Sequence, residues 1–94
     1  MSIQTLTPTS RPAPHPQVIL QESGEEAVLI LPAQGKVKVL NSTGAFIWKK
    51  LDGTHTLEEI AQALSQEYEV SPAEALQDVL AFTATLLERG LVTV

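Results

Sequence analysis

The sequence contains no cysteine, which excludes disulfide bonds, thiolate zinc sites and a cysteine nucleophile. It has only two histidines, His15 and His55, and neither has a partner at metal-ligand spacing. There is no glycine-rich phosphate-binding loop and no G-x-S-x-G motif. The sequence therefore predicts no catalytic site, no metal site and no cofactor.

Basic residues and long apolar runs are also scarce. Six Lys and Arg residues against eleven Asp and Glu residues give a formal charge of −5, which disfavours nucleic acid or an anionic membrane as a partner. No apolar run approaches the roughly 18 residues that span a bilayer. The N-terminal segment lacks the basic start and apolar centre of a secretory signal. We therefore expect a cytoplasmic protein without membrane contact.

The length of 94 residues fits one domain, and 44% hydrophobic residues are typical of a globular chain. Thr, Ser and Pro dominate residues 1–16, which we expect to form a flexible arm outside the core, with residues 17–94 as the folded domain. Three β-prone runs follow, at 18–21, 27–31 and 36–40. The second run is apolar throughout, which favours a central strand buried on both faces. Short turns between the runs favour an antiparallel meander.

Three helices are predicted after the strands, each from a local start signal. Asn41 or Ser42 is expected to cap the first helix, and Thr56 and Glu59 to form a capping box at the start of the second. At the start of the third helix, Ser71 and Glu74 are expected to form another capping box, and Pro72 takes the first helical position. Gly90 is expected to end the third helix, with Leu91 packing back on Leu86. Three strands followed by three helices define an α+β domain.

The third run, Lys36–Leu40, alternates strictly between lysine and valine before its final leucine. This alternation predicts that Val37 and Val39 point inward and that the lysines point outward. Two interpretations of the lysines compete. They could protect an edge strand from edge-to-edge aggregation, or the same free edge could accept an extended peptide as an added strand. The residues alone favour the first interpretation.

The last two helices are joined by a short link and could form a helix-turn-helix, so a winged-helix DNA-binding regulator is the alternative function. The exposed start of the third helix carries Glu74, Gln77 and Asp78. Carboxylates that face phosphates are repulsive, which argues against this alternative.

A series of short motifs begins at Leu40. The motifs are Leu40-Asn41-x-Thr43-Gly44-x-x-Ile47-Trp48, Leu51-Asp52-Gly53-x-x-Thr56, Glu59-Ile60-Ala61, Asp78-Val79-x-x-Phe82 and Gly90-Leu91-Val92. In this order and at these spacings, the series resembles the PqqD family. With the strands before it, the likeness covers about residues 17–94.

The resemblance implies a winged-helix-like domain, a three-stranded antiparallel sheet followed by three helices. Such a domain acts as a peptide chaperone: it binds the leader of a ribosomally made precursor peptide and presents it to a processing enzyme. The leader adds as a strand beside the third strand and lies against the third helix. The residues that the resemblance thereby assigns to peptide binding are Lys36, Val37, Lys38, Val39 and Leu40 on the strand, and Ala75, Asp78, Val79, Phe82 and Leu86 on the helix.

Several alternatives stay open within this interpretation. Core packing is the other explanation for Val79 and Leu86. Asp78 could receive a basic leader residue or cap a local backbone amide. The partner enzyme would be a radical SAM enzyme in the branch that makes pyrroloquinoline quinone, or a leader protease in the lasso-peptide branch. The free edge could also pair with a second copy in a homodimer.

Overall fold

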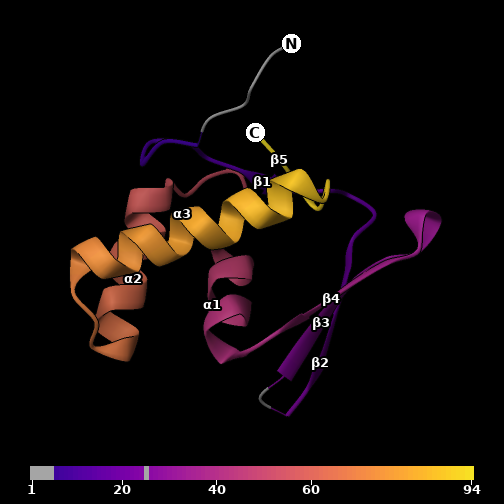
Figure 1. The fold of residues 1–94 in the computed structure, drawn as a ribbon, viewed down its shortest axis with the longest axis horizontal. Coiled ribbons are helices and arrows are strands. Elements are labelled where there is room, and N and C mark those ends of the chain that lie inside the picture. Colours follow the sequence, from indigo (N-terminus) through magenta and orange to yellow (C-terminus); the bar gives the residue numbers. More distant parts are fainter. Residues whose placement is uncertain (1–5, 25) are drawn as a thin grey trace.

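Three antiparallel strands form a meander, and the three longest helices follow it in the chain (Figure 1). The computed structural model describes residues 6–24 and 26–94. The strands of the meander are β2 (Ile19–Ser23), β3 (Glu26–Leu31) and β4 (Lys36–Leu40), and the helices are α1 (Ser42–Lys50), α2 (Leu57–Tyr68) and α3 (Pro72–Glu88). A single 3₁₀ turn, η1 (Pro32–Gln34), joins β3 to β4. The predicted fold class is therefore confirmed.

The sheet has the order β2-β3-β4, so β3 is central, as predicted. Its side chains at Ala27, Leu29 and Leu31 are buried, whereas Val28 and Ile30 are only half-buried. The prediction of burial on both faces was thus wrong for the outer face. The reason is that the helices pack on one side of the meander, so only the side chains that point to that side reach the core.

The orientation of β4 is the reverse of the prediction. Val37 and Val39 are each 60% exposed, while Leu40 is 2% exposed. Leu40 pairs with buried Ala27 of β3, and the pairing runs without interruption to Lys36 opposite Leu31. Because side chains alternate with period two, burying Leu40 places both lysines on the helix side and both valines on the outer face.

The helices begin and end largely at the predicted local signals. The Asn41 side chain accepts a hydrogen bond from the Gly44 amide at 2.8 Å, and Thr56 and Glu59 form the reciprocal capping box. Ser71 accepts from the Glu74 amide at 3.2 Å, but among the described residues Glu74 does not make the return bond of the second predicted box. The third helix ends as predicted in a Schellman motif: Gly90 has a φ of 73° and the Leu91 amide donates to the Leu86 carbonyl at 2.9 Å.

The N-terminal segment differs from the flexible arm that the sequence suggested. Residues 6–16 run along the α1–α2 turn, and the carbonyls of Pro8, Ser10 and Pro12 accept hydrogen bonds of 2.9–3.1 Å from backbone amides at residues 53, 57 and 58. Two of these amides belong to the first turn of α2, where the helix itself offers no acceptor. Farther along, β1 (Ala13–Pro14) pairs with β5 (Val92–Thr93) in a small second sheet. Residues 1–5 of the predicted arm lie outside the described residues.

Candidate functional site

The free edge of the meander is the β4 strand. In the part of the chain that the structure describes, β4 pairs with β3 on one side and with no strand on the other. One row of its backbone amides and carbonyls therefore lacks a β-sheet partner, which makes the strand a template for a further strand. The five-residue length of β4 is enough for several main-chain hydrogen bonds.

A hollow of about 390 Å³ lies between the end of β4, the first turn of α1 and the middle of α3. The residues that line it are Asn41, Thr43, Gly44, Ile47, Asp78, Ala81 and Phe82. Gly44 is buried, and a Cβ atom at this position would lie 3.2 Å from Cε1 of Phe82. The missing side chain therefore lets α1 approach the Phe82 ring closely, and the half-buried ring forms one wall of the hollow.

Asp78 is exposed at the rim of this hollow and, among the described residues, is the only charged one in its lining. None of the hydrogen bonds and ion pairs found among residues 6–24 and 26–94 involves its side chain. The predicted local amide cap for Asp78 is thus not formed. The exposed carboxylate lies beside the Phe82 ring at this hollow and is available to a ligand.

A second hollow, of about 300 Å³, lies where β4 begins and α3 ends. Its lining residues are Gly35, Lys36, Val37, Arg89 and Leu91. Across it, the Lys36 ammonium donates a hydrogen bond to the Arg89 carbonyl at 2.5 Å. This carbonyl belongs to the C-terminal end of α3, where a cation is favoured by the helix dipole. Lys36 therefore ties the start of β4 to the end of α3.

The two hollows lie at the two ends of β4, and residues of α3 or of its C-terminal end also line each of them; we call the surface from one hollow to the other the β4–α3 groove. The predicted site residues divide clearly around it. Lys36, Lys38, Asp78 and Phe82 are half-buried or exposed along the groove, and Val37 and Val39 expose their side chains on the opposite face of the sheet. The remaining predicted residues, namely Leu40, Ala75, Val79 and Leu86, are buried in the core.

Core packing is thus the structural role of Val79 and Leu86, the alternative that the sequence left open. Ala75 and Val79 are both 0% exposed, so their side chains cannot touch a ligand in this conformation. Conversely, sequence reasoning did not place Arg89 and Ala81 at the groove. The signal was available in the sequence, because residues 78, 82 and 89 are spaced by four and seven and so share one helical face.

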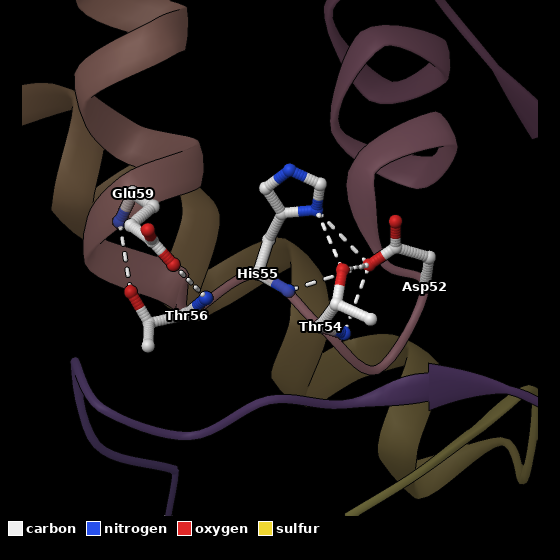
Figure 2. A network of polar contacts seen from close by, with 5 residues as sticks. All are labelled: Asp52, Thr54, His55, Thr56 and Glu59. Atoms are coloured by element: carbon white, nitrogen blue, oxygen red, sulfur yellow. Dashed lines mark hydrogen bonds and ion pairs between the residues drawn. The ribbon is translucent and has the colours of Figure 1, made fainter.

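A separate polar network holds the turn between α1 and α2 (Figure 2). One Asp52 carboxylate oxygen accepts from the Thr54 hydroxyl at 2.7 Å and from the Thr54 amide at 2.9 Å, and it lies 3.0 Å from Nδ1 of His55. These contacts, led by the Thr54 hydroxyl, hold the pKa of Asp52 well below its ordinary value. The Thr56 amide and hydroxyl likewise lower the pKa of Glu59. Every contact is between residues three or fewer positions apart, so the network stabilises a turn.

The described residues 6–24 and 26–94 offer no sign of a metal or membrane site. They contain no group of three or more His, Cys, Asp or Glu side chains that could hold a metal ion. None of their helices is both long and apolar enough to cross a bilayer. The features that suit a ligand are the unpaired strand and its groove, and such an edge defines the class of domain that binds an extended peptide by strand addition.

Comparison with known proteins identifies the family. The model of the family described as coenzyme PQQ synthesis protein D (PqqD) matches residues 26–92, and the chain belongs to this family. A PqqA binding protein of Xanthomonas oryzae pv. oryzae is 32% identical over 89 residues, which cover 95% of this chain and 97% of the relative. A PqqA binding protein of Xanthomonas axonopodis pv. citri is 33% identical over 86 residues, or 92% of this chain and 94% of the relative.

Two solved structures share the fold. A lasso peptide synthetase B1 complexed with the leader peptide superimposes with a TM-score of 0.80 at 28% identity, covering 90% of this chain and 100% of that chain. The PqqD truncation of Methylobacterium extorquens PqqCD is described as a stand-alone recognition element for ribosomally synthesized and post-translationally modified peptides. It superimposes with a TM-score of 0.81 at 25% identity and covers 96% of both chains. The resemblance seen in the sequence is therefore confirmed.

Proposed function

We propose that this protein binds the leader of a ribosomally made precursor peptide as an added strand on β4 and has no catalysis of its own. The observation that carries the proposal is the unpaired β4 strand beside the β4–α3 groove. Main-chain hydrogen bonds to the edge would supply affinity, and the two hollows would select side chains. The family relatives named for PqqA binding and the B1 protein solved with its leader support the same function.

The bound leader would be presented in the cytoplasm to a processing enzyme. The curated relatives, at up to 33% identity over nearly the whole chain, favour the quinone branch and a radical SAM enzyme as this partner. The lasso branch, with a leader protease, is supported by a structural match of similar quality. Titration of the purified protein with a PqqA peptide and with a lasso leader distinguishes the branches, because only the leader of the correct branch should bind at low micromolar concentration.

Binding to nucleic acid is not expected. In the structure the first half of α3, which would enter a DNA groove, exposes Glu74, Gln77 and Asp78. A gel shift with duplex DNA at low salt should therefore show no retention.

The docking strand can be tested by hydrogen exchange. A bound leader should slow amide exchange in residues 36–40 and along the 78–89 stretch of α3, because new main-chain bonds and burial protect both. Residues 57–68 of α2 serve as the internal control and should be unchanged. Protection confined to α2 would contradict docking on β4.

A pair of proline variants tests the same edge independently. Amides alternate in direction along a strand, so of Val37→Pro and Lys38→Pro one removes an amide that faces the free edge and the other removes an amide that pairs with β3. The variant that loses the amide facing the free edge should abolish leader binding while its circular dichroism spectrum stays native. Full binding by both variants would refute the proposal.

We also propose that β4 pairs with β4 of a second copy when no leader is present, since an unpaired edge accepts any strand. Sedimentation velocity across a range of concentrations should show a dimer that dissociates when leader is added. A strictly monomeric protein at every concentration would rule out this pairing.

A further inference from the structure

The two ends of the β4–α3 groove carry opposite charge. At one end lie Lys36 and Arg89, which line the smaller hollow, and Lys38 projects from the same face of β4 two residues beyond Lys36. Of the residues that the structure describes, no acidic one lines this hollow. These three residues are half of the six Lys and Arg residues in a chain with a formal charge of −5. The local positive charge is therefore not a reflection of the overall composition.

The lysines are held in this position by the sheet. Lys36 and Lys38 stand opposite Leu31 and Leu29 of β3, and both leucines are fully buried. On this side of the sheet the aliphatic stems of the half-buried lysines can cover apolar surface while their ammonium groups stay in water. The hydrogen bond from Lys36 to the Arg89 carbonyl fixes one of these groups. The cationic end is consequently built into the fold.

The other end combines a hollow of mixed polar and apolar lining with one carboxylate. Phe82 and Ile47 contribute to its walls, and in the described part of the chain Asp78 is the one charged residue at its rim. Asn41 has its side-chain oxygen engaged by the Gly44 amide. A ligand side chain that fits this hollow has an apolar body and a hydrogen-bond donor or cation at its tip, as in tyrosine, tryptophan, lysine or arginine.

The distance between the two ends sets a spacing. From Lys36 to Asn41 the strand rises about 17 Å at roughly 3.3 Å per residue. From Asp78 to Arg89 the helix rises about 17 Å at roughly 1.5 Å per residue. An added strand points alternate side chains into the groove, so the two groove-facing ligand residues are separated by an even number of positions. An extended peptide spans about 13 Å over four positions and about 20 Å over six, and these two lengths bracket the separation of the two ends of the groove.

Resting on the proposed function, we infer that the leader recognised by this protein carries an acidic residue opposite Lys36 or Lys38 and, four or six positions away, a donor-tipped aromatic or basic residue that enters the Asp78–Phe82 hollow. Antiparallel pairing with β4, the slightly more stable arrangement, places the acidic residue nearer the C-terminus of the leader. The groove thereby selects a leader by the order and spacing of an acidic residue and a donor-tipped residue.

Affinity selection tests this inference even when the natural leader is unidentified. A displayed library of random 15-residue peptides is selected on the immobilised full chain, and the enriched peptides are sequenced. The expected result is an acidic residue and a donor-tipped residue four or six positions apart. Enriched peptides that protect β4 from amide exchange but lack this pair would overturn the inference and leave the proposed function intact. Enrichment of no peptide, or protection of another surface, would overturn the proposed function.

Charge reversal gives the second arm of the test. Arg89→Glu should weaken binding of a selected peptide about fivefold at low salt, and it should have little effect on the same peptide when the acidic residue is replaced by its neutral amide. Asp78→Lys should change only the contribution of the donor-tipped peptide residue that enters the Asp78–Phe82 hollow. Arg11→Glu is the control, because it makes the same change in net charge on an exposed residue outside the groove. Equal effects of Arg89→Glu and Arg11→Glu would contradict the inference.

Discussion

The hydroxyl of Thr83 provides a stringent test of the packing described above. Thr83 is 0% exposed on the core face of α3, and its Oγ1 has no hydrogen-bond partner among the described residues. A buried polar group without a hydrogen-bond partner lowers the free energy of unfolding by about 1–3 kcal/mol, whereas a methyl group of the same shape carries no such desolvation penalty. Threonine and valine have nearly equal helix propensities, so Thr83→Val changes little besides the hydroxyl.

We expect Thr83→Val to raise the free energy of unfolding by about 1 kcal/mol, at the lower end of that range. For a domain of 94 residues this corresponds to a rise in Tm of about 4–8 °C. Thermal unfolding followed by circular dichroism gives Tm, and urea unfolding with an unchanged m value confirms that the folded state gained stability. Leader binding should not change, because the residue lies outside the groove.

Thr85 is the matched control on the same helix. It is half-buried, and its hydroxyl donates to the Ala81 carbonyl at 3.2 Å. Thr85→Val removes a satisfied hydroxyl and should leave stability unchanged or slightly reduced. If Thr83→Val destabilised the protein as much as Thr85→Val or more, the Thr83 hydroxyl would have to be bonded in solution and the reasoning would fail.

Three further predictions concern the groove and the turn. Phe82→Ala should weaken leader binding by about 2 kcal/mol or more in calorimetry, whereas Phe46→Ala, which removes an aromatic ring outside the groove, should not. Gly44→Ala places a methyl group 3.2 Å from the Phe82 ring and should push the ring toward the hollow, so leader affinity should fall while unfolding free energy changes by less than about 1 kcal/mol; an unchanged affinity would contradict this. The pKa of Asp52 is lower in the folded state than in the unfolded chain, so its contribution to stability is present above about pH 4 and is lost as pH falls below that value. Thermal melts between pH 5 and pH 2 should therefore show a smaller loss of Tm for Asp52→Asn than for the natural protein, and parallel curves would refute the role of this network.

The features that the sequence predicted well depend on residues close together in the chain. The caps at Asn41 and Thr56 each join residues three positions apart, and the Schellman end at Gly90 joins residues five positions apart. Such bonds form within one turn of the chain and do not depend on the tertiary fold. The order of elements followed from the same local signals and from the motif series of the family.

The orientation of β4 could not be obtained in this way. The stretch Lys36–Leu40 contains two conflicting alternations, since Val37 and Val39 favour one phase and Leu40 favours the other. Pairing of Leu40 with Ala27, thirteen positions earlier, decides between them. On α3 a similar difficulty arose, because the predicted set combined a buried face containing Ala75 and Val79 with the adjacent groove face.

The prediction of a flexible N-terminal arm was wrong for residues 6–16, and for a different physical reason. Its prolines lack an amide donor, which argued against ordered structure, but each keeps a carbonyl acceptor. The carbonyls of Pro8 and Pro12 accept from amides more than forty positions away in the chain, near the α1–α2 turn. The availability of those amides is a property of the folded turn and cannot be read from residues 6–16.

The pairing of β1 with β5 has a consequence for tethering. It places Ala13 opposite Thr93, so the C-terminal strand is anchored beside the N-terminal segment. In Figure 1 this place and the β4 strand lie on opposite sides of α3. An enzyme joined after β5 by a short linker would be held at high effective concentration near the domain without obstructing the edge where a peptide docks. Linker length would then determine how readily the enzyme reaches that peptide.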